Sequence, residues 1–278
     1  MVLKLASKKP ASNKRASNKR WRLAGPACSV VVLTCALSAA AGEKALPPPE
    51  ETEVWQPVPP KVDAPANGVP SDAKVLFAGT DTGAWEHADA KTEDGRPVRW
   101  KVVDGALVVT PGSGDIRTRE AFGDVQLHLE FRTLAQPTGE GQGASNSGVF
   151  LMERYELQVL DSYRNTTYVN GQAASVYKQY PPLVNASRPP GEWQSYDVLF
   201  LAPRFAADGR VLAPARMTVL HNGVLVQHDV ALRGPTEYRG QPKYEAHAAQ
   251  LPLRLQDHGD RVAFRNIWIR PIARPVSP

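Results

Sequence analysis

Short apolar runs dominate the chain between residues 72 and 271. They are rich in Val, Leu, Phe and Trp, and they are separated by Gly, Asp, Asn or Pro, which is the pattern of strands joined by turns. No window shows helical periodicity over three turns. The pattern predicts strands at 73–79, 99–110, 124–133, 147–152, 154–161, 193–202, 215–230, 251–259 and 261–272.

Two of these runs contain the sequence of a tight hairpin turn. Asn222-Gly223 interrupts the run at 215–230, and Asp104-Gly105 interrupts the run at 99–110. Both dipeptides supply the positive φ angles that a two-residue hairpin loop requires. Because the region is nearly all β, we expect a sandwich of two antiparallel sheets, such as a jelly roll.

The first 41 residues have a different composition. Residues 1–22 contain eight Lys or Arg and no acid, and an apolar run that ends in alanines follows them. This pattern predicts a secretory signal with cleavage near Ala40 or Ala41, and hence export to the periplasm or the extracellular space. An uncleaved membrane anchor is the alternative, because the apolar run is near the lower length limit for a membrane span. A lipid anchor on Cys35 is disfavoured, because Thr34 precedes that cysteine where Ala or Gly is usual.

The predicted signal also accounts for the basic charge of the chain. It holds eight of the 33 basic residues, and the remaining 25 face 28 acidic residues. The charge therefore gives no reason to expect a nucleic-acid partner, and we expect membrane contact only through the N-terminus. Both cysteines, Cys28 and Cys35, lie in the same segment, so the mature chain would have no disulfide, thiolate metal site or cysteine nucleophile.

Composition divides the rest of the chain into a linker and one domain. Residues 42–71 contain eight prolines and little apolar periodicity, which predicts an extended linker without regular structure. Residues 72–278 then form a region of about 200 residues, a normal size for a single β-sandwich.

The predicted strand at 154–161 combines an apolar face with a polar one. Side chains two apart on a strand share a face, so Tyr155, Leu157 and Val159 can enter a core while Glu156 and Gln158 point the other way. In the strand at 251–259, Arg254, Gln256 and His258 similarly share the face opposite three leucines.

If the two strands are close, these side chains form one polar surface. Large hydrogen-bonding groups on a concave face suit a sugar, whose hydroxyls need several convergent donors and acceptors. An ordinary solvated sheet face shows the same alternation and stays open as an interpretation. Such faces are usually richer in Lys, Thr and Ser than in Gln, His and Arg, which favours the sugar-binding surface.

Six motifs in order resemble the 3-keto-disaccharide hydrolase domain family over about residues 75–272. They are "VLFAGTDTGAW", "RWKVVDGALVV", "SNSGVFLMERYELQVLDSY", "GEWQSYDVLF", "HNGVLV" and "LRLQDHGDRVAFRNIWIRPI". The resemblance implies an exported protein with a concanavalin-like jelly roll that cleaves 3-keto-glycosides. A ketone at C3 acidifies the hydrogen on C2, so one base can start an elimination that expels the glycosidic oxygen from C1, and water then adds.

The proposed elimination and ordinary glycoside hydrolysis require different catalytic residues. Elimination needs one base, a group that stabilises the enolate and a donor for the leaving oxygen, whereas ordinary glycoside hydrolysis needs two carboxylates. Gln158 occupies the alternate position after Glu156 where a second acid would stand, and Asp161 falls on the other face. The two-carboxylate mechanism is therefore disfavoured.

The candidate roles follow from this comparison. Glu156 and His258 are the candidate catalytic bases or metal ligands, and a divalent cation would suit such a donor set, although the sequence alone does not show one. Arg254 could stabilise the enolate oxygen. The candidate substrate-binding residues are Asn146, Gln158, Asp161, Tyr177, Arg254 and Gln256.

Two other classes of function remain open. A non-catalytic carbohydrate-binding module on a Pro-rich linker would present the same polar surface without turnover. A protein-interaction domain would instead present exposed apolar patches.

Overall fold

The computed structural model describes residues 46–66, 68–89, 96–136 and 138–273. The predicted secretory signal, residues 1–41, lies outside these residues. The chain divides into two compact units, Met1–Val58 and Pro59–Pro278, and each is described by itself. No helix in the described part of the chain is long and apolar enough to cross a membrane.

The described residues of the proline-rich segment contain one element of regular structure. The 3-10 helix η1 spans Pro49–Thr52 and begins with proline, whose fixed φ suits the first position of a helix. Residues 54–58 form no strand. The sequence pattern predicted no regular structure here, so η1 is a small local difference.

The larger sheet of the second unit has eight antiparallel strands. Their order is β13-β12-β9-β6-β15-β4-β3, and β1 pairs with β15 beside this path. The strands are β1 (Lys74–Phe77), β3 (Lys101–Val103), β4 (Ala106–Val108), β6 (Val125–Arg132), β9 (Gln194–Leu201), β12 (Arg216–His221), β13 (Val224–Ala231) and β15 (Ala263–Pro271).

The smaller sheet has five antiparallel strands in the order β2-β5-β14-β7-β8. They are β2 (Trp85–His87), β5 (Ile116–Phe122), β14 (Leu251–Leu255), β7 (Ser147–Leu151) and β8 (Tyr155–Val159). A separate two-stranded ribbon joins β10 (Arg204–Phe205) to β11 (Val211–Ala213), and η2 (Gly141–Gly143) and η3 (Val169–Gly171) are short 3-10 helices in loops.

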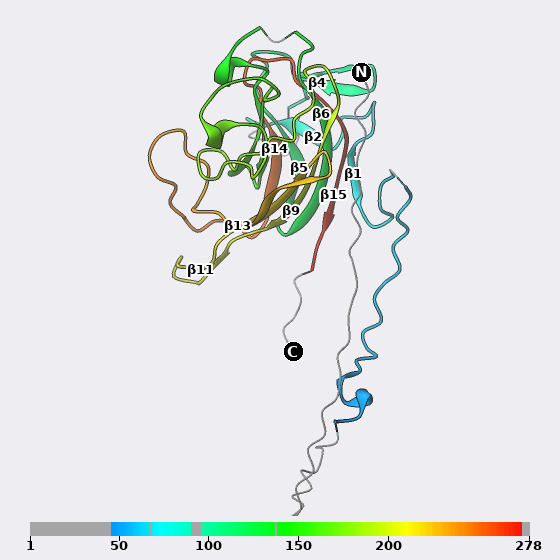
Figure 1. The fold of residues 1–278 in the computed structure, drawn as a ribbon. Coiled ribbons are helices and arrows are strands. Elements are labelled where there is room, and N and C mark those ends of the chain that lie inside the picture. Colours follow the sequence, from blue (N-terminus) through cyan, green and yellow to red (C-terminus); the bar gives the residue numbers. More distant parts are fainter. Residues whose placement is uncertain (1–45, 67, 90–95, 137, 274–278) are drawn as a thin grey trace, which may run out of the picture. The chain divides into compact units, whose positions relative to one another are not determined.

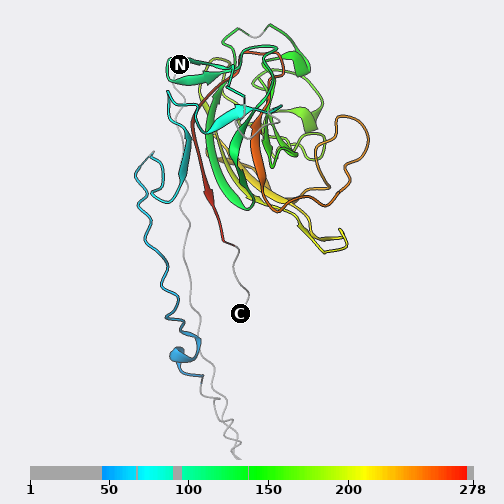
Figure 2. The ribbon, with the colours of Figure 1, turned by 180° about the vertical axis from the view of Figure 1, so that it is seen from behind.

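The two sheets pack against each other around one apolar core (Figure 1). Strand β6 alternates buried and half-buried positions along its length, and its buried side chains include Leu127 and Phe131. The smaller sheet contributes Tyr155, Leu157 and Val159, each with 0% exposure. The view from behind shows the same layers from the other side (Figure 2).

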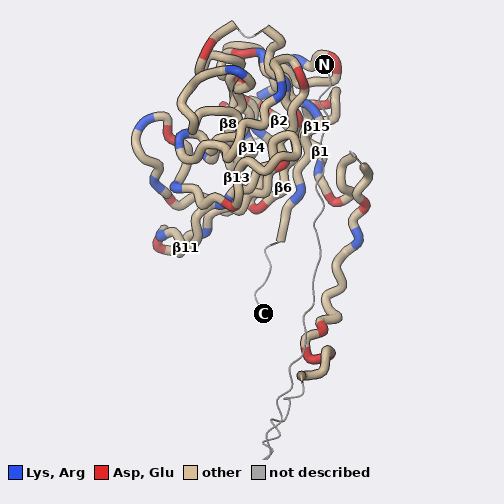
Figure 3. The backbone as a smooth tube through the Cα atoms, viewed as in Figure 1, with Lys and Arg blue, Asp and Glu red and all other residues tan. Residues whose placement is uncertain are grey.

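The two predicted hairpin turns are present. Asn222 and Gly223 have φ angles of 53° and 78° between β12 and β13, and Asp104 and Gly105 have 50° and 74° between β3 and β4. The described residues form no α-helix, and the predicted fold class, a concanavalin-like jelly-roll sandwich of antiparallel sheets, is confirmed. Basic and acidic residues intermingle over the described part of the sandwich (Figure 3).

Candidate functional site

The polar side chains of β8 point away from the core but are not solvated. Glu156 is 5% exposed and Gln158 is 1% exposed, although both lie on the outer face of the smaller sheet. An ordinary solvated face would leave both side chains in water, so that interpretation of the alternating pattern is wrong for this strand.

A segment with little regular structure covers the free edge of β8. Val176 pairs with Leu157 in an isolated antiparallel bridge, and the backbone N–H of Tyr177 donates to the carbonyl oxygen of Glu156 at 3.2 Å. Residues opposite each other in an antiparallel pair share a face. Tyr177 therefore stands beside Glu156 on the outer face.

A second covering segment follows β13. The backbone N–H of Glu156 donates to the hydroxyl oxygen of Thr236 at 2.9 Å, and the backbone N–H of Thr236 donates to the carbonyl oxygen of Arg154 at 2.7 Å. Together with the segment around Tyr177, it turns the outer face of the sheet into a cavity.

This cavity, called here the Glu156 cavity, has a volume of about 380 Å³. The predicted convergence of Glu156, Gln158, Gln256 and His258 is confirmed, because all four line it. The complete lining is Asn146, Phe150, Glu156, Gln158, Tyr177, Thr236, Tyr238, Gln256 and His258.

Strand β7 lies between the two strands that carry the polar residues. Gly148 pairs with Gln158, and Phe150 pairs with Glu156. The backbone N–H of Gln256 donates to the carbonyl oxygen of Gly148 at 3.0 Å. Because Gly148 has no side chain, the floor between Gln256 and Glu156 stays open.

Burial raises the pKa of Glu156 to about 8. The positive charge of Arg254 partly offsets this rise, and the negative charge of Asp115 adds to it. The side-chain amide nitrogen of Gln158 donates to Oε1 of Gln142 at 3.0 Å, and exchanging the nitrogen and oxygen of this amide would let it donate to Oε1 of Glu156 at 3.2 Å. A carboxyl with such a pKa exchanges its proton near neutral pH, which a general base requires.

The side-chain oxygen of Gln256 is buried and has no hydrogen-bond partner among the described residues. A buried acceptor without a partner costs roughly 1–3 kcal/mol. A ligand hydroxyl in the cavity would satisfy it, so this atom makes the cavity a candidate binding site.

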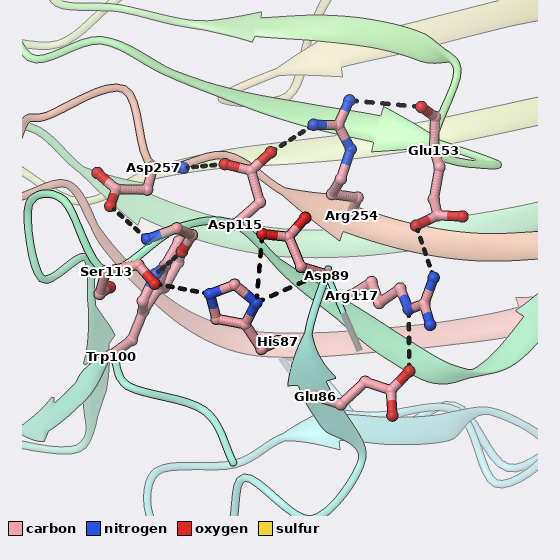
Figure 4. A network of polar contacts seen from close by, with 11 residues as sticks. Glu86, His87, Asp89, Trp100, Ser113, Asp115, Arg117, Glu153, Arg254 and Asp257 are labelled. Carbon is pink, nitrogen blue, oxygen red and sulfur yellow. Dashed lines mark hydrogen bonds and ion pairs between the residues drawn. The ribbon is translucent and has the colours of Figure 1, made fainter. Parts of the chain in front are cut away.

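A polar network holds the loop that carries Gln256 and His258 (Figure 4). The carboxylate of Asp115 accepts the backbone N–H of Asp257 at 2.8 Å. The carboxylate of Asp257 in turn accepts the backbone N–H groups of Gly114 at 2.9 Å and Gly259 at 3.0 Å. His258 is exposed, but these bonds fix its backbone at the mouth of the cavity.

Two residues predicted to bind substrate do not line the cavity. The guanidinium of Arg254 forms an ion pair with Asp115 (Figure 4). It also lies 3.8 Å from the ring centroid of Phe150. It therefore supports the cavity wall and acts on Glu156 through its charge, without direct access to the interior.

Asp161 follows the end of β8 and lines a separate cavity of about 360 Å³ with Tyr163 and Asn165. Its carboxylate accepts the backbone N–H of Tyr163 at 3.1 Å. Asp161 was expected to bind the same ligand as Glu156, but it does not line the Glu156 cavity.

Asn146 lines the cavity and is itself held in place. Its side-chain N–H donates to the carbonyl oxygen of Gln142 at 2.7 Å, and its backbone N–H donates to the carboxylate of Asp260 at 2.8 Å. The side-chain carbonyl oxygen of Asn146 is left to accept from a ligand.

The sequence pattern missed Phe150, Thr236 and Tyr238 as lining residues. Phe150 shares a face with Glu156 across the β7–β8 pair, and the pairing register would have revealed it. Thr236 and Tyr238 lie in an irregular segment, where no periodic pattern exists to place them.

The described residues contain no cluster of three or more His, Cys, Asp or Glu that could hold a metal ion. A cation at Glu156 and His258 would need amide oxygens to complete its ligands.

The comparisons with known proteins agree with this fold. The model of the 3-keto-alpha-glucoside-1,2-lyase-like domain matches residues 72–270. The chain belongs to this family. The resemblance to the 3-keto-disaccharide hydrolase family, inferred from the six motifs, is confirmed.

Two solved structures of proteins from Parabacteroides distasonis are similar to this chain. A protein from Parabacteroides distasonis, provisionally named a glycosyl hydrolase, is 43% identical, with a TM-score of 0.76, over 81% of this chain and 97% of its own. Another protein from that organism with the same provisional name is 22% identical, with a TM-score of 0.51, over 73% of this chain and 94% of its own, and supports the fold alone. No curated protein matches the chain.

Proposed function

We propose that this domain cleaves 3-keto-glycosides by eliminating the glycosidic oxygen after removal of the proton on C2, and that water then adds at C1. The observation that carries the proposal is the composition of the Glu156 cavity. Among the described residues that line it, Glu156 is the only carboxylate. Paired-carboxylate hydrolysis would lack its second acid here, whereas elimination next to a ketone needs only one base.

Glu156 is the proposed base. It is buried beside polar groups, and its pKa of about 8 lets roughly one molecule in ten accept a proton at pH 7. The same carboxyl, once protonated, can return the proton to C2 when water adds. A pKa close to the working pH suits a group that must both take and give a proton.

The other lining groups suit a sugar. Gln256 offers a buried acceptor without a partner, Asn146 offers its side-chain oxygen, and Gln158 is held beside Glu156. His258, at the mouth, can donate to the C3 ketone and so stabilise the enolate, the role that the sequence pattern gave to Arg254. Family membership and the 43% identical relative support a carbohydrate-acting, glycosidase-type enzyme, which we propose acts outside the cytoplasm.

The test compares two substrates. The purified domain is incubated with a 3-keto-disaccharide and with the same disaccharide unoxidised, and free sugar is measured over time. Release from the keto form alone supports the proposal. Binding of both sugars without turnover of either would overturn it and would favour a carbohydrate-binding module. Equal cleavage of both would require a mechanism that does not use the ketone.

A further inference from the structure

A second hollow adjoins the Glu156 cavity. It has a volume of about 550 Å³, and Tyr177 and Tyr238 line both spaces. Tyr168 and Lys178 line the second hollow only. Ligand pockets of this size hold small molecules, so the two spaces can hold the two halves of one glycoside, with Tyr177 at the boundary.

The second hollow has an aromatic wall that is fixed in place. Tyr168 is 40% exposed and Tyr238 is 66% exposed. The ammonium group of Lys178 donates to the carbonyl oxygen of Tyr238 at 2.8 Å and lies 4.4 Å from the centroid of its ring. Exposed aromatic rings beside polar groups stack on the apolar face of a sugar ring.

Tyr177 is placed beside the base by backbone pairing. It lies opposite Glu156 across the edge of the sheet, with a backbone hydrogen bond of 3.2 Å between them. Cross-strand neighbours on one face have Cβ atoms about 4.5–5.5 Å apart. The hydroxyl of Tyr177 also forms a hydrogen bond of 2.6 Å with the hydroxyl of Tyr168.

We infer that the hydroxyl of Tyr177 donates the proton to the leaving glycosidic oxygen, and that the second hollow is the subsite for the leaving sugar. This inference rests on the proposed function. C2–H and C1–O are neighbouring bonds, so an elimination needs a base and an acid in the same cavity, and Glu156 and Tyr177 both line the Glu156 cavity.

The step balances as follows. Glu156 takes the proton from C2 and an enolate forms; the enolate collapses, the C1–O bond breaks, and the leaving oxygen takes the proton of Tyr177. The products are an unsaturated keto-sugar, a free alcohol and a tyrosinate, which accepts a hydrogen bond from Tyr168. When water adds at C1, its proton returns to Tyr177, and Glu156 returns its proton to C2.

Burial raises the pKa of Tyr177. The phenol therefore stays protonated, ready to donate, in the range where Glu156 titrates.

The experiment uses two leaving groups. The wild type and Tyr177→Phe are assayed with a 3-keto-disaccharide and with a 4-nitrophenyl 3-keto-glucoside, whose phenolate leaves without a proton. We expect Tyr177→Phe to lower kcat on the disaccharide on the order of a hundredfold or more, and to change kcat on the nitrophenyl substrate by less than about tenfold. Tyr163→Phe is the matched control, because Tyr163 lines a separate cavity and is 39% exposed; it should change neither rate.

Two further readouts complete the test. Tyr177→Phe should still exchange the C2 hydrogen of the keto-sugar in heavy water, which shows that the base and the fold are intact. Tyr238→Ala should raise KM for the disaccharide several-fold and leave kcat nearly unchanged. An equal loss on both substrates, or no loss on either, would overturn the inference for Tyr177, and an unchanged KM in Tyr238→Ala would overturn the subsite. A wild type that converts neither keto-sugar would overturn the proposed function itself.

Discussion

A Cβ atom added to Gly148 would lie 3.1 Å from Oε1 of Glu156. The same atom would lie 3.3 Å from the side-chain oxygen of Gln256 and 2.7 Å from the ring of Phe150. The bare backbone of β7 thus provides the space in which the two polar strands face a common ligand.

Gly148→Ala should therefore damage the site. A methyl group would force the ring of Phe150 and the carboxyl of Glu156 to move, and overpacking of this kind costs roughly 1–3 kcal/mol. We expect a lower melting temperature and a loss of kcat/KM on a 3-keto-disaccharide of about tenfold or more. Gly143→Ala is the control, because nothing lies within 4 Å of its added Cβ. Full activity in Gly148→Ala would show that the floor between Glu156 and Gln256 is not occupied during the reaction.

Glu156→Gln tests the base directly. Gln keeps the shape and most of the hydrogen bonding but cannot accept a proton, so kcat should fall on the order of a hundredfold or more. The affinity for the keto-sugar, measured by calorimetry, should stay within about tenfold. Exchange of the C2 hydrogen in heavy water should also be lost. If the variant retains full activity, Glu156 is a binding residue and the base is to be sought at His258.

The sequence pattern predicted the parts of the site that depend on strand periodicity. On β8, Glu156 and Gln158 alternate with three core residues, so the alternation alone predicted that both side chains point away from the core. The distance between β8 and β14 depended on strand order, and the sequence did not show that β7 lies between them. Asp161 follows the end of β8 at Val159, and it lines a separate cavity.

The remaining errors concern partners far apart in the sequence. Arg254 occupies an alternate position of β14, which predicted that it would line the cavity. Its guanidinium instead forms an ion pair with Asp115, on a different segment, and lies 3.8 Å from the ring centroid of Phe150. Thr236 and Tyr238 reach the cavity through an irregular segment, whose path is set by tertiary hydrogen bonds that leave no periodic pattern in the sequence.

The buried carboxyl of Glu156 should destabilise the fold at alkaline pH. Its folded-state pKa of about 8 lies above the ordinary value for glutamic acid, 4.5, so the folded state holds the proton more tightly than the unfolded state. The stability that the protonated group provides is fully present below about pH 4.5 and is lost as the pH rises through 8. Glu156→Gln cannot ionise, so it should unfold at a higher temperature than the wild type at pH 9, with a much smaller difference at pH 5. Calorimetric melting of both proteins at the two pH values measures this, and equal differences at both would contradict the buried titration.

Two neighbouring charges should move the pH dependence of the rate in opposite directions. If Glu156 is the base, kcat/KM should rise with pH and level off above about 8, because only the ionised carboxylate accepts the C2 proton. Asp115 raises the pKa of Glu156 and Arg254 lowers it. Asp115→Asn keeps an oxygen to accept the backbone N–H of Asp257 but removes the negative charge, so the inflection should move below 8. Arg254→Met keeps much of the contact with Phe150 but removes the positive charge, so the inflection should move above 8.

These two shifts separate an electrostatic effect from simple structural damage. Each should be on the order of half a pH unit or more for a charge this close, and damage alone would lower the rate without moving the inflection in opposite directions. Glu153→Gln is the matched control. Its carboxylate belongs to the same network through an ion pair with Arg117 of 3.5 Å (Figure 4), but it is not among the charges that shift the pKa of Glu156. The profile of kcat/KM between pH 5 and 10 is measured for all four proteins. If Asp115→Asn and Arg254→Met both leave the inflection in place, another group sets the rate, and Glu156 is not the base that removes the C2 proton.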